Sequence, residues 1–429
     1  MSLKPRYLLL LGFLLSACLP HSRKSTNPSV RPPADDYELV TPTLATADEA
    51  VRTIQLYRTG DETALPVLPM NSGETLTLEF DLLTRTGRPL SIFFYHANRN
   101  WQRDLVPTEY MDRSNRDELL QMTLAQGIQI PYVHYTYRFP NDQIDFRYSG
   151  NYIIRVTEQG DEDAVLFERT FLVSEENTRT RFVLQPLLLG SVGTSYQPTL
   201  QIIPPGNLEQ QIFDFYTCFS RLPQWMHLRC TTRPPLVTPP VLEFALVSAS
   251  AFPPEQPYRL LDLSTLRAGR SIDRIDVSQR PYEVFLAPDP AGLGNILPVL
   301  ELNGQPVIRA AVRDVVDPAT MAEYTRTYFR LQPPEGKYLG DPVLVLGSFL
   351  SWTPSDQSVL TWNPETGYYE GTLLIKQGLY EYRYAGPELE RYLRQQRTLG
   401  TRTTYVAFVY YFDTQKQTDR LLAVQTALP

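Results

Sequence analysis

Short apolar runs separated by turn residues cover most of the chain. In residues 75–80 polar and apolar residues alternate strictly, which is the period of a half-buried β-strand. Comparable runs are bounded by Gly, Asn, Asp or Pro. The predicted strands are residues 53–58, 75–80, 90–95, 133–139, 151–158, 165–173, 182–189, 199–203, 211–219, 241–247, 282–286, 343–346, 368–375, 379–384 and 405–412. This spacing predicts an all-β fold of tandem immunoglobulin-like, antiparallel β-sandwich domains.

Two stretches depart from this pattern. Residues 259–266 fit either a strand or a helical turn, and their sequence does not separate the two. Residues 387–399 place Leu389, Tyr392 and Leu393 at helical spacing among charged residues. They predict a short surface helix that packs one apolar edge on a sheet.

The N-terminus has the features of an export signal. Two basic residues precede an apolar run over residues 7–15, which is followed by Ser16-Ala17-Cys18. A small pair before cysteine resembles the bacterial lipobox and predicts a lipoprotein signal peptide over residues 1–17 with lipidation of Cys18. The alternatives are a cleaved secretory signal that happens to contain a cysteine, and an N-terminal anchor helix. The apolar run is short for a membrane span.

Composition divides the rest of the chain into four parts. Five prolines among scattered Ser, Thr and Asn make residues 18–47 a lipidated, Pro-rich tether. The short apolar runs that follow predict an N-terminal β-sandwich over residues 48–176 and a middle β-rich domain over residues 177–322. A C-terminal immunoglobulin-like sandwich is expected over residues 323–429.

Cys218 and Cys230 remain once Cys18 is assigned to lipid. They flank eleven residues between an apolar run and a Thr pair, so a disulfide across a hairpin or long loop is one interpretation. Two reduced, half-buried thiols are the other. A zinc site is not expected, because His227 alone cannot complete a set of zinc ligands with the two cysteines.

Charge and motifs argue against several function classes. The net charge is −7 and no basic block is present, which is unfavourable for binding nucleic acid. No nucleophile elbow, phosphate-cradling glycine loop or His-Glu-x-x-His motif occurs. We therefore expect a non-enzymatic protein without cofactor, metal or small-molecule substrate, in which His96 and His134 are structural. Asp161-Glu162-Asp163 is interpreted as a solvated hairpin turn rather than a calcium loop.

A group of aromatic residues in the C-terminal region suggests glycan binding as an alternative function. Residues 345–352, 362–371 and 379–384 resemble glycogen-binding-type modules with an immunoglobulin-type sandwich. In such modules exposed rings stack on sugars, and Trp352 or Trp362 would be the candidates. The other interpretation is that these rings fill the core. The alternative function is therefore an outer-membrane glycan-binding lipoprotein that uses its C-terminal domain.

Five ordered blocks carry a second resemblance. They are residues 53–83, 107–112, 135–173, 274–289 and 373–384. In these blocks the chain is similar to the plug protein family of the type IX secretion system of Bacteroidota, formerly a domain of unknown function. The resemblance implies a periplasmic plug that binds and seals the periplasmic opening of the outer-membrane barrel translocon in its idle state. It brings no catalytic residues with it.

The resemblance and the signal together give expectations for partners and location. The expected partner is the barrel translocon, and the only membrane contact is the lipid on Cys18, in the inner leaflet of the outer membrane. Residues 19–24 lack an acidic cluster that resembles a surface-export signal, which favours this periplasmic location. The middle region and residues 96–101 depart most from the family. Candidate partner contacts are Asp61, Glu62, Trp101, Tyr110, Asp161, Glu162 and Asp163.

Overall fold

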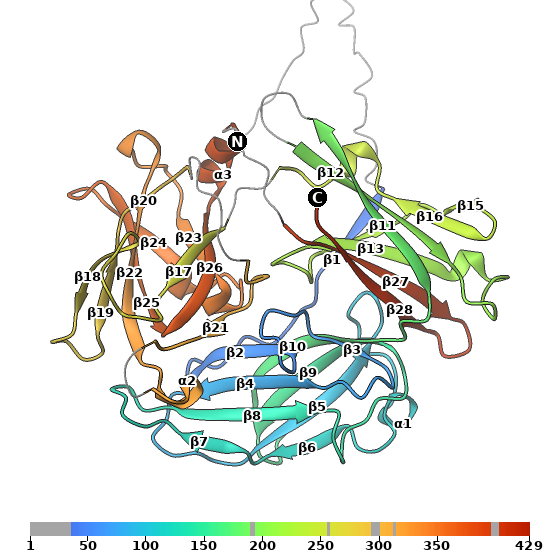
Figure 1. The fold of residues 1–429 in the computed structure, drawn as a ribbon, viewed down its shortest axis with the longest axis horizontal. Helices are drawn as coiled ribbons and strands as arrows, with labels where there is room; N and C mark the ends of the chain where they lie inside the picture. The colour runs from blue at the N-terminus through green and yellow to red at the C-terminus, as the bar shows by residue number, and fades with distance from the viewer. Residues whose placement is uncertain (1–35, 189–193, 255–257, 293–300, 312–314, 396–402) are drawn as a thin grey trace, which may run out of the picture. The chain divides into compact units, whose positions relative to one another are not determined.

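The fold consists of packed β-sandwiches (Figure 1). A computed structural model describes residues 36–188, 194–254, 258–292, 301–311, 315–395 and 403–429. Their strands form two pairs of facing sheets and one ten-stranded sheet, which confirms the all-β prediction. No helix in these ranges is long and apolar enough to cross a membrane. The predicted signal peptide, Cys18 and the first part of the tether lie outside the described residues.

The first sandwich is formed by residues 51–174. One sheet has the order β2-β4-β8-β7 and the other β3-β10-β9-β5-β6. Alternate residues of β4 from Leu76 to Leu82 are fully buried, and the Phe80 ring stacks on Tyr135 with centroids 5.0 Å apart. The elements are β2 (Val51–Arg58), β3 (Val67–Pro69), β4 (Leu76–Leu82), β5 (Leu90–Ala97), α1 (Pro107–Tyr110), β6 (Arg116–Leu119), β7 (Met122–Leu124), β8 (Val133–Phe139), β9 (Gly150–Glu158) and β10 (Val165–Ser174).

The second sandwich combines strands from three parts of the chain. Its sheets have the orders β1-β14-β13-β27-β28 and β11-β12-β16-β15. Leu200, Phe244 and Val409 belong to the core between them. The elements are β1 (Tyr37–Val40), β11 (Arg179–Leu188), β12 (Thr194–Ile203), η1 (Ile212–Asp214), β13 (Phe215–Arg221), β14 (Leu228–Thr231), β15 (Leu236–Thr238), β16 (Val241–Ala245), η2 (Ser248–Ser250), β27 (Tyr405–Asp413) and β28 (Thr418–Ala427).

The third sandwich is the ten-stranded sheet, which encloses its own core. The path is β17-β26-β23-β24-β25-β22-β19-β18, and two short strands pair beside it. The strands are β17 (Arg259–Asp262), β18 (Ile272–Asp276), β19 (Glu283–Leu286), β20 (Asp289–Pro290), β21 (Val307–Ile308), β22 (Tyr324–Gln332), β23 (Val343–Gly347), β24 (Val359–Asn363), β25 (Tyr368–Lys376) and β26 (Gly378–Ala385). The helices are α2 (Pro318–Met321), η3 (Pro334–Gly336), η4 (Ser348–Leu350), η5 (Asp356–Ser358) and α3 (Pro387–Gln395).

The structure resolves the ambiguous stretch and contains the predicted helix. The segment that fitted either a strand or a helical turn begins with strand β17, which pairs with β26. The predicted surface helix is α3, with Leu389 only 1% exposed against the core of the third sandwich and Leu393 partly buried beside it. The last predicted helical residues, 396–399, lie outside the described part of the chain.

The sheets do not follow the predicted division between residues 322 and 323. Residues of β27, near the C-terminus, pair one by one with β13, from Phe215 opposite Tyr411 to Arg221 opposite Tyr405. Strands β17 to β20, from the predicted middle domain, pair within the ten-stranded sheet. The prediction failed because an apolar pattern marks a strand but not its partner, and a substantial minority of consecutive strands are not neighbours.

The predicted tether is too long at its C-terminal end. Tyr37–Val40 form strand β1, which pairs with β14, and Val40 is 6% exposed. Asp36 is also buried, and its Oδ2 accepts a hydrogen bond from the Val247 backbone at 2.6 Å. A four-residue strand among prolines gives little local signal, and tertiary pairing decides its conformation.

Cys218 and Cys230 lie directly opposite each other on β13 and β14. The structure joins them in a disulfide. The first of the two interpretations of this pair is therefore the one that the structure contains. The bond lies beside the apolar cluster between the first and second sandwiches.

Candidate functional site

The predicted partner contacts fall into two groups. Asp61, Asp161, Glu162 and Asp163 are exposed in turns, where a partner could reach them. Glu62 is half-buried and pairs with Arg309 of the third sandwich at 3.1 Å. These five positions stay predictions.

Trp101 and Tyr110 are not available to a partner. Trp101 is 6% exposed and packs against Trp225, with ring centroids 6.3 Å apart, between the first and second sandwiches. Tyr110 is 1% exposed and donates a hydrogen bond to the Phe94 carbonyl at 2.9 Å. The prediction is wrong for both side chains, because a large ring in a polar loop was assigned to the surface although it fills an intramolecular contact.

The two candidate sugar-binding tryptophans are half-buried. Trp352 donates from Nε1 to the Gly304 carbonyl at 2.8 Å, so its polar edge is occupied within the chain. Trp362 lies between Tyr338 and Tyr369, with centroids 5.9 Å and 5.3 Å away. Trp362 also packs on the core of the third sandwich.

The most unusual chemistry lies between the first and third sandwiches. Asp81 on β4 faces His134 on the neighbouring strand β8, on the side of the sheet opposite to the core residue Phe80. From the third sandwich, Lys376 at the end of β25 lies opposite Tyr324 at the start of β22. We call these four residues, with Glu79 and Tyr132, the buried seam.

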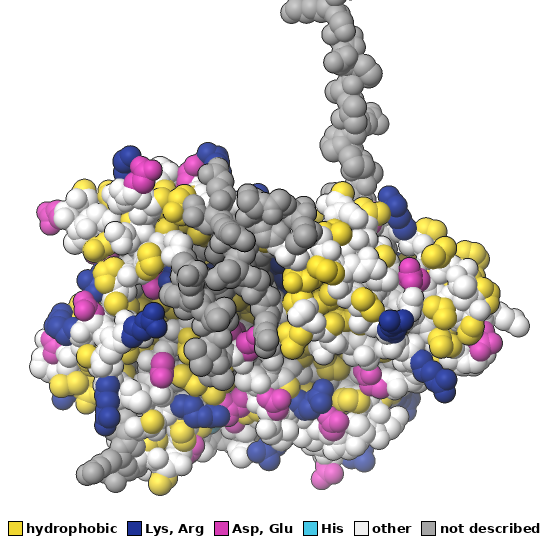
Figure 2. Space-filling view, turned by 45° about the horizontal axis from the view of Figure 1, so that its top comes forward, with side chains coloured by type: hydrophobic (Ala, Val, Ile, Leu, Met, Phe, Trp, Pro, Cys, Tyr) yellow, Lys and Arg dark blue, Asp and Glu magenta, His cyan; other side chains and the backbone are white. Residues whose placement is uncertain are grey.

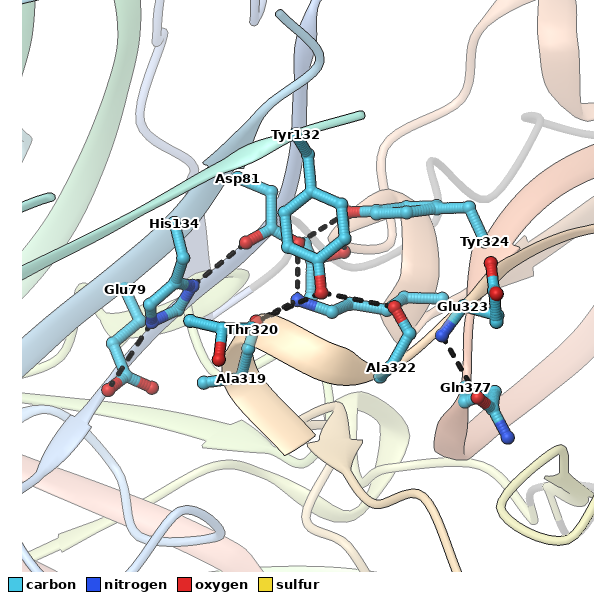
Figure 3. A network of polar contacts seen from close by, with 12 residues as sticks. Glu79, Asp81, Tyr132, His134, Ala319, Thr320, Ala322, Glu323, Tyr324 and Gln377 are labelled. Carbon is cyan, nitrogen blue, oxygen red and sulfur yellow. Dashed lines mark hydrogen bonds and ion pairs between the residues drawn. The ribbon is translucent and has the colours of Figure 1, made fainter. Parts of the chain in front are cut away.

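Asp81 is the centre of the buried seam (Figure 3). Its Oδ2 accepts from Lys376 Nζ at 2.6 Å and from the Tyr324 hydroxyl at 2.7 Å. Its Oδ1 lies 2.8 Å from His134 Nδ1. The side chains of Asp81 and Lys376 are each 1% exposed, so this ion pair is shielded from water and screening salt.

Two further groups complete the coordination of Lys376. Its Nζ donates to the Ala319 carbonyl at 2.6 Å and lies 4.2 Å from the centre of the Tyr132 ring, a cation–π distance. The Tyr132 hydroxyl donates to the carbonyl of Ala322 at 3.0 Å. The ammonium group is therefore held by residues of both sandwiches.

The pKa values follow from this environment. Burial would raise the pKa of Asp81, but Lys376 and the hydrogen bond from His134 together lower it below its ordinary value. Burial would lower the pKa of His134, but the hydrogen bond to Asp81 and the nearby Glu79 carboxylate raise it to about 9. Burial also lowers the pKa of Lys376, against the opposing field of Asp81. The seam thus places a carboxylate between two cationic groups at neutral pH.

The buried seam has a structural rather than a catalytic arrangement. Both oxygens of Asp81 are occupied within the chain. The cavity beside it, lined in part by Thr53 and Tyr380, holds about 10 Å³, which is room for a single water molecule at most. In the described ranges no group of three or more His, Cys, Asp or Glu could hold a metal ion. What the seam can do is fix two sandwiches to each other.

A second contact region joins the first and second sandwiches. Arg99 pairs with Asp419 of β28 at 2.6 Å, and its backbone N–H donates to the same carboxylate at 3.0 Å. Arg420 forms two hydrogen bonds of 2.7 Å with Glu175. The apolar cluster around Trp101 packs between the same two sandwiches. The first sandwich is therefore tied to both others.

The sequence did not predict the buried seam. Lys376 lies between the predicted strands 368–375 and 379–384, where β25 and β26 meet, and a lysine at such a turn is ordinarily solvated. His134 was expected to be structural, and the structure agrees. Asp81 follows the alternating residues 75–80 at a polar position. In the sequence it cannot be distinguished from a strand residue that faces solvent.

Comparisons with known proteins assign the first sandwich. Residues 51–175 match the family described as "Type 9 secretion system plug protein 1st domain". The crystal structure of a hypothetical protein from Parabacteroides merdae ATCC 43184 is similar with a TM-score of 0.81 and 22% identity, covering 91% of this chain and 100% of that chain. This likeness shows the fold. No curated protein matches the chain. The match supports the resemblance inferred from the sequence: residues 51–175 of the chain fit the first-domain family of the type 9 secretion system plug protein.

Proposed function

We propose that this chain is a non-enzymatic periplasmic plug that binds and seals the periplasmic opening of the outer-membrane barrel translocon of the type IX secretion system when it is idle. The observation that carries the proposal is the match of residues 51–175 to the plug domain family. The buried seam and the Arg99–Asp419 contact add a physical reason. A plug must resist deformation, and buried ion pairs between sandwiches oppose hinge motion.

The surface is consistent with a seal that depends on fit. On the face in Figure 2, basic and acidic side chains are interspersed rather than gathered by sign. This face therefore offers no single-sign field to attract a charged partner. Affinity would come from a few well-packed residues within a large contact area.

Deleting the protein tests the proposal. We expect the deletion strain to take up a dye that normally cannot cross its outer membrane, while secreted enzymes still reach the medium. A strain that lacks both the plug and the barrel is the control, and it should exclude the dye again. An intact barrier in the single deletion, with the barrel present and empty, would contradict the proposed plug function.

The competing function is glycan binding through the third sandwich. Trp362 and the exposed ring of Tyr338 are the observation that favours it. Retention of the purified chain on a polysaccharide column, lost in Trp362→Ala, would support it. The proposed plug function predicts that the chain is not retained on the column.

The location follows from the predicted lipidation of Cys18. We expect Cys18→Ser to convert the protein from an outer-membrane fraction to a soluble, folded periplasmic protein, because the lipid is the proposed membrane anchor. Fractionation of cells that lack the barrel measures this directly. Membrane retention of the variant in those cells would contradict a lipid anchor.

A further inference from the structure

Strand β7 leaves one row of backbone groups unused. It is the outer strand of its sheet, and hydrogen bonds from Ala125 N to Tyr132 O and from Thr136 N to Gln121 O join it to β8. In an antiparallel ladder the alternate residues direct their N–H and C=O away from the partner. These residues are Met122 and Leu124, and no described strand pairs with them on that side.

The same residues carry exposed apolar side chains. Leu120, Met122 and Leu124 are 60%, 37% and 54% exposed. Met122 lies opposite Tyr135 and Leu124 opposite Val133, both fully buried in the core. Because directly paired residues share a face, Met122 and Leu124 belong to the core side of the sheet. The core of the first sandwich therefore continues to this edge and is open there.

The other described edge strands are protected. Charged side chains, prolines or both commonly block pairing of a free edge. Such residues occur within β1, β2, β3, β6, β11, β17, β18, β20 and β28, and Pro306 and Arg309 directly flank the two-residue strand β21. The edge strand β15 has neither, but Pro234-Pro235 and Pro239-Pro240 flank it directly. By contrast, residues 119–130 around β7 contain no charge and no proline.

The edge of β7 also has a defined length. The next outward N–H along the chain, that of Gln126, donates to the Thr320 carbonyl of α2 at 3.1 Å. The backbone N–H of Gln129 donates to Glu323 at 2.9 Å. The third sandwich thus closes the edge at one end and leaves the outward groups from Leu120 to Leu124 open. This is room for an added strand of about five residues.

We propose that β7 is a strand-addition site for an extended segment of a partner, uncharged and apolar at alternate positions. Main-chain hydrogen bonds to Met122 and Leu124 would supply the pairing, and alternate apolar side chains would cover the open core edge. The absence of charge in residues 119–130 makes a neutral segment the complementary occupant, because a charged one would lose hydration without gaining a partner on this strand. The inference rests on the proposed function in one respect, that the segment belongs to the translocon.

Amide hydrogen exchange on the purified chain tests the site itself. The probe is the peptide acetyl-Thr-Val-Thr-Val-Thr-Val-Thr-amide at millimolar concentration. We expect exchange at Met122 and Leu124 to slow at least tenfold, and Met122→Pro to abolish binding of the peptide. Proline at this position removes an outward donor but no bond to β8, so the fold is expected to persist. Leu124→Lys is the second variant, and it should also abolish the slowing of exchange by the peptide.

The matched control is Leu236→Lys on β15, an edge strand of the same length with an exposed leucine. It should leave the slowing at Met122 and Leu124 unchanged. Equal exchange with and without peptide in the unaltered chain would overturn the site. Concentration-dependent dimerisation that Met122→Pro abolishes would assign the edge to a second copy and overturn it as well.

Photo-cross-linking in cells tests the partner. A benzoylphenylalanine placed at position 124 should form an adduct that contains the barrel translocon, and one at position 237 on β15 should not. No adduct from position 124 would overturn the assignment to the translocon. This result is distinguishable from failure of the proposed plug function, because dye uptake in the deletion strain measures that function separately.

Discussion

Replacing Asp81 by asparagine is expected to lower the free energy of unfolding by about 3–5 kcal/mol. The change leaves Lys376 buried with its countercharge removed, and a carboxamide cannot accept hydrogen bonds from Lys376, Tyr324 and His134 as the carboxylate does. Guanidinium denaturation of the purified chain measures the loss. A change below about 1 kcal/mol would show that the seam is not buried as described.

Two further variants make this result specific. Asp81→Asn combined with Lys376→Met removes the carboxylate and the ammonium group together, and it should be less destabilising than the sum of the single changes because no buried lysine is left without its countercharge. Glu335→Gln is the exposed control. Glu335 pairs with Lys337 at 2.6 Å, but both side chains are 74% exposed, so no measurable change is expected.

Stability is expected to fall between pH 6.5 and about pH 9 because of His134. The folded chain raises the pKa of this imidazole from 6.5 to about 9, so it stays protonated in a range where the unfolded chain releases its proton. The stabilisation is complete below pH 6.5 and is lost as the pH rises through 9. Its size is on the order of 3 kcal/mol.

His134→Gln isolates this contribution. Glutamine can still donate a hydrogen bond to Asp81 but does not titrate. Unfolding free energies at several pH values from 6 to 9.5 should decline less in the variant than in the unaltered chain. His227, whose pKa is lowered by burial, is common to both proteins. Parallel curves would contradict the raised pKa.

Most of the longer strands and the helix α3 were predicted from the sequence, but β22 and β28 were missed. Alternation in residues 75–80 predicted the core of β4, and the helical spacing of Leu389 and Leu393 predicted α3. These predictions succeeded because side-chain periodicity depends only on the geometry of the strand or helix itself. The ordered blocks that resemble the plug family were also visible without a structure, and the match over residues 51–175 confirms the three that lie within it.

The assembly of those elements was not readable. Pairing of β27 with β13 joins residues nearly two hundred positions apart, and burial of Trp101 depends on a contact with Trp225 in another sandwich. The same holds for the exposed edge of β7, which is visible only once its neighbours are known.

The sequence by itself thus determined the all-β class, most of the longer strands and the resemblance of the first domain to a family. The tertiary structure alone decided which strands share a sheet, that Asp36–Val40 belong to the folded body, and that Asp81, His134 and Lys376 meet. The reason is physical. A strand pattern records which face of a segment is apolar, whereas the partner of a polar residue on the other face is set by packing between distant parts of the chain.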